Sequence, residues 1–560
     1  MAFIVNFMRR INTDLQASPW FIALLFIVLI GPFALDFHMH YPDEMYYSDA
    51  AVTMIQNKDY LTTYLGSGEL RFKKPILTYW GVLAGFELFG ISPFSSRLFF
   101  LLAGAFTVVL VHKIAMVTFS DKKIAVLSSL IAASHPVLIF SSTRSIPDIL
   151  LALCITFSAW GFAGLLKYGN LAPKKYLWIL YVGLGLAFQA KGLPAVAIGG
   201  LGLLYLLFNP WQRISLKKLL HFPSILVAVA IAVFWFLSMY WKFGATYLDS
   251  FLGDQVGERV AGRTWVMLIN LFLAIILMVV MFFPWAFLAL KNIKTNVATL
   301  VCEDKAFFWW VVVWIIGIIL MSALVTKFYE RYLLPVIPLA GIGLAWLLVQ
   351  RPSIAKGKLL AGFLYFLLGL NVVVWLAALF LNIGMAAAWY VFPGMLLGLV
   401  TMALLYKNII ARRDLYFWLS VSLMLIFFNL SFVTYQLSLP HQGTQVREFV
   451  ERHGIPKGSK VAFIGHLHTG SKMRIGLGKD YQMTDLPKEG YEEALSGYDY
   501  IICEEAIKNQ LPESAYSIQT ASLMWDLKLL PEMMQSILKG NYPELLEQTG
   551  KRYYWLERKK

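Results

Sequence analysis

The chain has 560 residues, of which 59% are hydrophobic and 14% are charged, so it is too apolar for a soluble globular protein of this length. Its formal net charge is +15, but from Ser438 onward sixteen Lys and Arg balance sixteen Asp and Glu, so the excess lies in the apolar part. Basic residues between apolar segments report membrane topology and lipid contacts, which argues against a nucleic-acid-binding protein. The composition predicts a polytopic membrane protein.

Apolar segments recur along the chain at lengths close to the roughly 20 residues that a membrane-spanning helix needs. They are 20-36, 75-91, 96-118, 124-141, 146-166, 176-190, 193-209, 222-243, 264-290, 306-325, 332-349, 357-381, 387-406 and 414-437. If all but 75-91 span and the N-terminus is cytoplasmic, every short inner loop is basic, as at Lys122 and Lys123. We therefore expect about thirteen transmembrane helices, with 75-91 lying at the interface or packed on the bundle.

This topology divides the chain into a transmembrane part at 1-437 and an outer domain at 438-560. A polar first loop at 37-95 lies on the same outer side. The C-terminal part is richer in charge, and 460-464 and 498-503 predict buried strands between turns. Residues 445-453, followed by Gly454, predict a helix with a glycine stop. The expected fold class is an all-α polytopic membrane protein with a small C-terminal α/β domain.

Acidic residues follow prolines at two places on the predicted outer face. Asp43 and Glu44 follow Pro42, and Asp148 follows Pro147. Acids in the first turn of a helix match its dipole, which is a structural explanation. The functional alternative is that a carboxylate acts as general base on an acceptor hydroxyl or holds a divalent ion. The residues leave open which of Asp43 and Asp148 is the base.

Cations gather on the same predicted face, against the positive-inside bias. With an adjacent tyrosine, they suit the phosphate of an isoprenyl carrier whose tail lies against apolar helices. Fixed cations also stabilise phosphate as a leaving group. The alternative is that they neutralise nearby acids or contact lipid headgroups. The candidates for binding the donor phosphate are Lys74, Lys191, Arg259, Lys327, Arg331 and Tyr332.

At these residues the chain resembles bacterial membrane glycosyltransferases of the GT-C fold, in the dolichyl-phosphate-mannose protein mannosyltransferase superfamily. Within it, the chain resembles the lipid A aminoarabinose transferases. The matching motifs follow the family's order across residues 40 to 340. They are Pro42-Asp43-Glu44 with Tyr47, Ala51 and Met54, Lys74-Pro75 with Tyr79-Trp80, Arg97, Pro147-Asp148-Ile149, Lys191-Gly192, Phe283-Pro284-Trp285, and Arg331-Tyr332-Leu333-Leu334-Pro335 with Pro338.

The resemblance implies an inverting transferase of the bacterial inner (plasma) membrane that uses a polyprenyl-phosphate-linked sugar on the periplasmic side. It implies Asp43 near the acceptor or reacting centre, Asp148 as the second acid, and Lys74, Arg259 and Tyr332 at the carrier phosphate. Lys73 and Asp254-Gln255 replace the Glu and Glu-His that help define a metal site in the aminoarabinose transferases. No cofactor is assigned, and a divalent metal is left open.

The function expected from the sequence is transfer of a hexosyl or pentosyl group to a cell-envelope glycolipid, such as lipid A or a polysaccharide precursor. A protein acceptor is the first alternative. A second is a lipid-linked sugar flippase without chemistry, which would favour pseudo-symmetric halves and polar residues near mid-bilayer. The ionisable residues instead crowd the outer ends of the predicted helices. The expected partners are the donor lipid, the glycolipid acceptor and membrane lipids.

Overall fold

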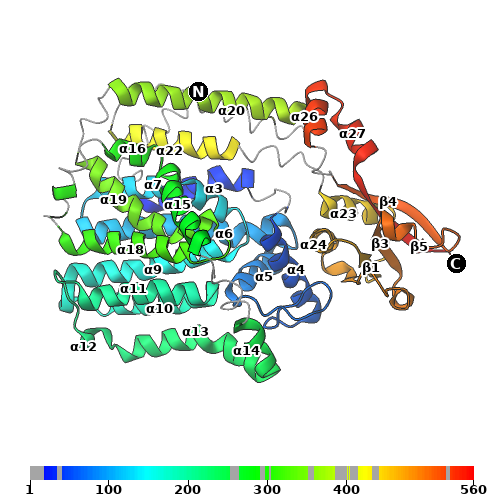
Figure 1. Ribbon diagram of the computed structural model, residues 1–560, viewed down its shortest axis with the longest axis horizontal. Coiled ribbons are helices and arrows are strands. Elements are labelled where there is room, and N and C mark those ends of the chain that lie inside the picture. The colour runs from blue at the N-terminus through cyan, green and yellow to red at the C-terminus, as the bar shows by residue number, and fades with distance from the viewer. Residues whose placement is uncertain are drawn as a thin grey trace.

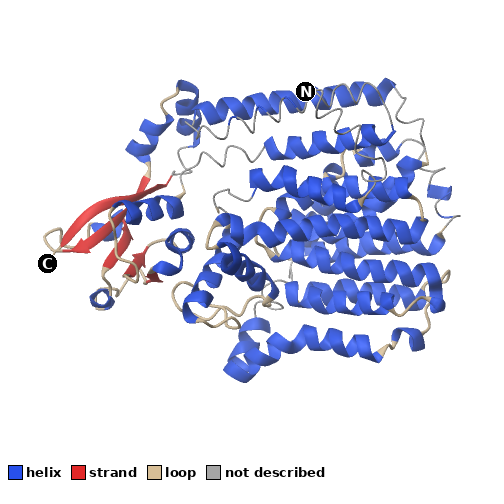
Figure 2. Cartoon of the chain, turned by 180° about the vertical axis from the view of Figure 1, so that it is seen from behind, coloured by secondary structure: helices blue, strands red, loops and turns tan. Residues whose placement is uncertain are grey.

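The computed structural model describes residues 18-34, 39, 41-252, 264-290, 297-299, 301, 304-350, 358-384, 392, 396, 400, 403, 414-431, 441-524 and 530-559. A bundle of helices fills one end of the molecule and a five-stranded sheet lies at the other (Figure 1). Helices α4 (Pro42–Asn57) and α5 (Leu77–Phe89) lie between the two in both views (Figure 2).

The remaining described helices of the bundle are given in chain order. They are α3 (Pro19–Ala34), α6 (Pro93–Phe119), α7 (Lys122–Ala133), α8 (Pro136–Ser142), α9 (Pro147–Tyr168), α10 (Lys175–Lys191), α11 (Leu193–Phe208), α12 (Leu216–Leu219), α13 (Phe222–Phe243), α14 (Ala245–Leu252), α15 (Thr264–Met281), α16 (Trp285–Leu290), α18 (Lys305–Ala323), η3 (Glu330–Val336), α19 (Ile337–Val349), α20 (Lys358–Gly384) and α22 (Asp414–Ser431).

Among the described residues, seven helices are long and apolar enough to cross a membrane, or eight if the bent pair α7 and α8 is one span. The chain is therefore a multi-pass membrane protein. The expected count of thirteen stays a prediction, because the expected span 387-406 lies largely outside the described residues. Helix α5 has 13 residues, which rise about 20 Å against a hydrocarbon core of about 30 Å. The expectation that 75-91 does not span stays a prediction, because α3 and α11, which are expected to span, are also shorter than the hydrocarbon core.

Two expected spans differ in shape from the prediction. Segment 124-141 is not one straight helix, since α7 and α8 meet at 62° where Pro136 interrupts the hydrogen-bond ladder. Segment 264-290 is divided into α15 and α16 around Pro284, for the same reason. Apolar content alone does not reveal such breaks.

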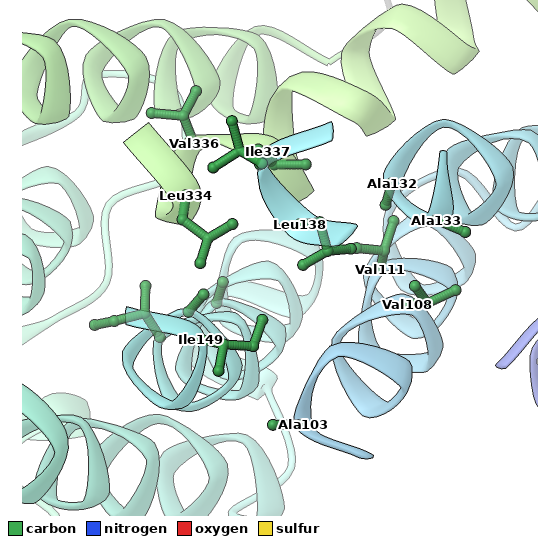
Figure 3. Packing of buried hydrophobic residues seen from close by; sticks show 14 of the residues in the cluster. Ala103, Val108, Val111, Ala132, Ala133, Leu138, Ile149, Leu334, Val336 and Ile337 are labelled. Carbon is green, nitrogen blue, oxygen red and sulfur yellow. The ribbon is translucent and has the colours of Figure 1, made fainter. Parts of the chain in front are cut away.

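Close packing of backbones and a shared apolar core hold the bundle together. A Cβ on Gly161 of α9 would lie 2.6 Å from the backbone of α10, and one on Gly183 of α10 would lie 2.7 Å from the backbone of α9. Small residues that permit such approach are typical of membrane helix pairs. Figure 3 shows buried side chains of α6, α7, α8 and α9 in one apolar cluster with Leu334, Val336 and Ile337. This core fixes the backbone beside Asp148 and beside Arg331.

The C-terminal domain is built on a sheet in the order β2-β1-β3-β5-β4. Strand β1 is parallel to β2 and β3, whereas β5 is antiparallel to β3 and β4. The strands are β1 (Lys460–Ile464), β2 (Gln482–Asp485), β3 (Tyr500–Glu504), β4 (Tyr516–Met524) and β5 (Lys551–Arg558), and the helices are α23 (Gln442–Arg452), α24 (Leu467–Leu477), α25 (Glu505–Lys508), α26 (Leu530–Lys539) and α27 (Tyr542–Thr549). The expected strand 460-464 is β1, the expected strand 498-503 overlaps β3, and the expected helix 445-453 overlaps α23, which begins three residues earlier.

Candidate active site

Helix α4 is fixed to the bundle by a buried ion pair. Glu44, which is fully buried, accepts hydrogen bonds from Arg97 Nε at 2.6 Å and Nη2 at 2.9 Å, and from the Ser145 backbone N–H at 3.2 Å. Burial by itself would raise the pKa of Glu44, but Arg97 and Ser145 hold that pKa below its usual value. Both carboxylate oxygens are therefore occupied by groups of the protein, and Glu44 presents no accessible face to a substrate.

Hydroxyl groups extend this network between three segments. The Ser48 and Ser96 Oγ atoms are 2.7 Å apart, and Ser96 Oγ is 2.7 Å from Ser145 Oγ. Ser145 Oγ in turn donates to Glu44 at 3.3 Å. The chain of hydroxyls joins α4 to the start of α6 and to the turn before α9, so the two acid-bearing helices keep a defined relation.

Asp43 and Asp148 converge on the same two cations. Arg331 Nη2 donates to Asp43 Oδ2 at 2.9 Å, and Arg331 Nε lies 3.3 Å from Asp148 Oδ2. Lys191 Nζ donates to Asp148 Oδ1 at 2.5 Å. The Asp43 side chain is 45% exposed, whereas that of Asp148 is 5% exposed. Asp43 is thus the carboxylate that an incoming substrate can reach, and Asp148 holds the cations in place.

Aromatic rings surround these cations. Lys191 Nζ lies 4.5 Å from the centre of the Tyr332 ring, and the Arg331 guanidinium lies 4.3 Å from Tyr329 and 5.0 Å from Tyr41. Rings attract cations through their negative faces. A ring contact does not use the N–H groups of the cation as hydrogen-bond donors. Arg331 Nη1 is buried and has no hydrogen-bond partner among the described residues.

Further cations of the first loop act on Asp43. Burial and the nearby Asp148 raise the pKa of Asp43, while Arg71, Lys74 and Lys191 oppose the rise. The Arg71 guanidinium is stacked 4.3 Å from the Tyr46 ring. Lys74 is buried, at 8% exposure. The site therefore combines two acids with four cations, Arg71, Lys74, Lys191 and Arg331.

The other candidates from the sequence lie apart or cannot be placed. Lys327 is exposed and is not one of the described cations that pair with the two acids. Arg259 and Asp254-Gln255 lie outside the described residues. Among the described residues no group of three His, Cys, Asp or Glu side chains could hold a metal ion, and Lys73, in place of a Glu, is an exposed cation. The described residues therefore do not fit the metal site of the aminoarabinose transferases.

Four residues of the site received no individual role from sequence reasoning, although they lie in or beside the motifs quoted from the sequence. They are Arg97, Arg71, Tyr41 and Tyr329. Tyr41 and Tyr329 lie within the polar motifs around Asp43 and Arg331, so aromatic neighbours of those charges were the available signal. Arg97 opens a span, where a cation is equally well explained by a lipid headgroup.

Comparison with solved structures identifies the fold. The crystal structure of ArnT from Cupriavidus metallidurans bound to undecaprenyl phosphate superposes with a TM-score of 0.69 and 16% sequence identity, over 96% of this chain and 97% of that chain. The apo structure of the same protein gives a TM-score of 0.68. The chain has the GT-C fold. It is similar to the lipid A aminoarabinose transferases, as the motifs of the sequence predict.

Sequence comparisons cover a smaller part of the chain. The family described as dolichyl-phosphate-mannose-protein mannosyltransferase matches residues 73–241. An uncharacterized protein of Aquifex aeolicus is 30% identical over 38% of this chain and 42% of its own length. The undecaprenyl phosphate-alpha-4-amino-4-deoxy-L-arabinose arabinosyl transferase of Yersinia pestis is 28% identical over 34% of each chain. The matched segment thus spans less than half the length of these curated relatives.

Proposed function

We propose that this protein is an inverting glycosyltransferase that moves a sugar from a polyprenyl phosphate carrier to a cell-envelope glycolipid. The observation that carries the proposal is the convergence of Asp43 and Asp148 on Arg331 and Lys191. Two acids against four cations leave a formal charge of +2, which complements a carrier phosphate. The likeness to a fold seen with undecaprenyl phosphate and to an arabinosyl transferase supports this donor class.

In this mechanism the half-exposed Asp43 accepts the proton of an acceptor hydroxyl as that oxygen attacks the anomeric carbon. The bond from that carbon to the carrier phosphate breaks on the opposite face, so the configuration inverts. Lys191 and Arg331 meet the charge that grows on the leaving phosphate, and their fixed positions require little reorganisation. Lys74 adds a further positive charge near the leaving phosphate. Asp148 orients the two cations, and Glu44 positions α4.

The proposal includes a membrane orientation. The N-terminus is cytoplasmic, the domain at 438-560 is periplasmic, and the site faces the periplasm at the outer ends of the helices of a bacterial inner-membrane protein. Arg259 remains proposed as a further phosphate ligand. A glycolipid is the acceptor that the similarity to the lipid A aminoarabinose transferases supports, and a protein acceptor is the alternative.

The test is sugar transfer by purified protein in detergent with lipid, from a panel of radiolabelled polyprenyl phosphate sugars to envelope lipid extract. Asp43→Asn and Lys74→Ala are expected to abolish transfer at equal folding. The matched control is Asp480→Asn, because Asp480 is 44% exposed and is paired with Lys457 at 2.8 Å. Label in protease-sensitive material would favour a protein acceptor. No product from any donor, with carrier binding that neither variant weakens, would contradict the transferase and favour a flippase.

A further inference from the structure

A buried arginine of the C-terminal domain contacts the helix that carries Asp43. Arg474 of α24 is 1% exposed and forms ion pairs with Asp49 of α4 and with Asp485 at the end of β2. Its Nε donates to the Met483 carbonyl at 2.9 Å, and Ser471 Oγ donates to Asp49 Oδ2 at 3.2 Å. Asp49 is itself 1% exposed, so this contact lies in a closed interface.

Contacts beside Arg474 join the same two parts of the chain. Gln56 Nε2, at the end of α4, donates to the Tyr481 carbonyl at 2.9 Å. The Asp485 N–H donates to the Gly66 carbonyl at 3.1 Å. Gly66 also permits the close approach, because a Cβ on it would lie 1.9 Å from Arg474 Nη1. The first loop and the C-terminal domain are therefore shaped around the guanidinium.

The three acids of α4 point in different directions around the helix. At 100° per residue, Glu44 and Asp49 are about 140° apart, and Asp43 lies on the remaining arc between them. One ion pair holds α4 to the bundle through Arg97, and the other holds it to the C-terminal domain through Arg474. Rotation or sliding of α4 would break at least one of them, so the two pairs together set the position of Asp43.

We propose that Arg474 is a positioning residue: it fastens α24 of the C-terminal domain to α4 and thereby aligns Asp43 with the cations of the site. The inference rests on the proposed function for its kinetic consequence, but the attachment of α4 can be measured without it. The C-terminal domain would then affect catalysis by positioning Asp43, without contacting the donor. The donor cations Lys191 and Arg331 lie on α10 and η3, which Arg474 does not touch.

The test uses two different variants, each of which removes the contact between Arg474 and α4. The triple variant Arg474→Met, Asp49→Asn, Asp485→Asn removes the pairs without leaving a buried charge, which by itself would favour unfolding. Gly66→Ala leaves the arginine and both acids in the sequence but occupies the space of the guanidinium. The matched controls are Arg452→Met, an exposed arginine of the same domain, and Gly497→Ala, where a Cβ would meet no atom within 4 Å.

Two readouts are taken on the full chain in lipid nanodiscs. Turnover is expected to fall about 10- to 100-fold with the donor KM nearly unchanged, since a shift near 1 Å of a catalytic group can cost that much. Amide exchange of residues 45 to 56 is expected to accelerate about tenfold or more, while that of α9 and α10 stays as in the wild type. Both controls are expected to match the wild type in both readouts.

Unchanged turnover and unchanged exchange of α4 in both folded variants would overturn the proposal. Faster exchange in every helix alike would also overturn it, because Arg474 would then serve stability alone. Absence of transfer by the wild type would contradict the proposed glycosyltransferase instead, and the exchange of α4 would still decide whether Arg474 holds that helix.

Discussion

Removal of Arg97 distinguishes a structural from a catalytic Glu44. Arg97→Met leaves a carboxylate that is fully buried and has lost two hydrogen bonds from a guanidinium. Two opposite charges about 4 Å apart interact by about 4 kcal/mol at an effective dielectric constant near 20. Breaking one side of a buried pair costs about 3 to 5 kcal/mol in measured cases. We therefore expect the single variant to lose about 3 to 5 kcal/mol in free energy of unfolding.

The double variant Glu44→Gln, Arg97→Met removes both charges and keeps similar volumes. The amide oxygen that this change introduces replaces a carboxylate oxygen as acceptor for the Ser145 N–H, so most of the lost stability is expected to return. The assay is a double-mutant cycle from denaturant unfolding of the protein in mixed micelles, followed by intrinsic tryptophan fluorescence. A double variant as unstable as the sum of the two single variants would refute the reasoning. So would a stable Arg97→Met.

Two further predictions concern the pH profile and the packing of the bundle. Asp43 must be ionised to accept a proton, so transfer is lost as pH falls through the pKa of Asp43. Burial and Asp148 raise that pKa. The acid limb of the pH profile of turnover is therefore expected above the ordinary pKa of 3.8. Arg71→Met should move this limb to higher pH, since a cation that favours the ionised form of Asp43 is lost. Asp148→Asn should move the limb to lower pH, since a neighbouring negative charge is lost. Identical limbs in the wild type and both variants would assign the limb to another group. Gly183→Val is expected to lower the free energy of unfolding by about 1 to 3 kcal/mol, because the new side chain would meet the backbone of α9. The control Gly200→Val has open space at its Cβ and should change the unfolding midpoint little. Equal midpoints of the two variants would contradict the close contact of α9 and α10.

Local sequence signals predicted the individual elements well. Pro42 and Pro147 are found at the first turns of α4 and α9, because proline is pre-shaped for that position and lacks only an N–H that has no helical partner there. Short apolar runs predicted β1 and, two residues too early, β3, and Ala462 and Ile501 are paired in register. The break in segment 124-141 was missed because hydropathy averages over Pro136.

The site required the fold, because its members come from distant segments. Arg331 is separated from Asp43 by 288 residues, and Arg474 from Asp49 by 425. From the sequence, Asp43 was explained as well by a helix dipole, and Arg331 by a nearby acid or a lipid headgroup, while no pattern singled out Asp49 or Arg474. Glu44 illustrates the limit: it was grouped with Asp43 as catalytic because the two are adjacent. One helical residue, about 100° of rotation, turns Glu44 into the interior and leaves Asp43 accessible.

The sequence by itself determined that the protein lies in a membrane, the approximate position of many of its helices and of two strands, and which outer-face charges needed explaining. These properties depend on hydropathy and on neighbours a few residues away. Tertiary structure alone decided which ion pairs form. Arg97 pairs with Glu44, and Arg331 pairs with both Asp43 and Asp148. Arg474 of the C-terminal domain pairs with Asp49 of α4. An ion pair between distant segments depends on how the backbones pack, and no local pattern encodes which partner a buried charge will meet.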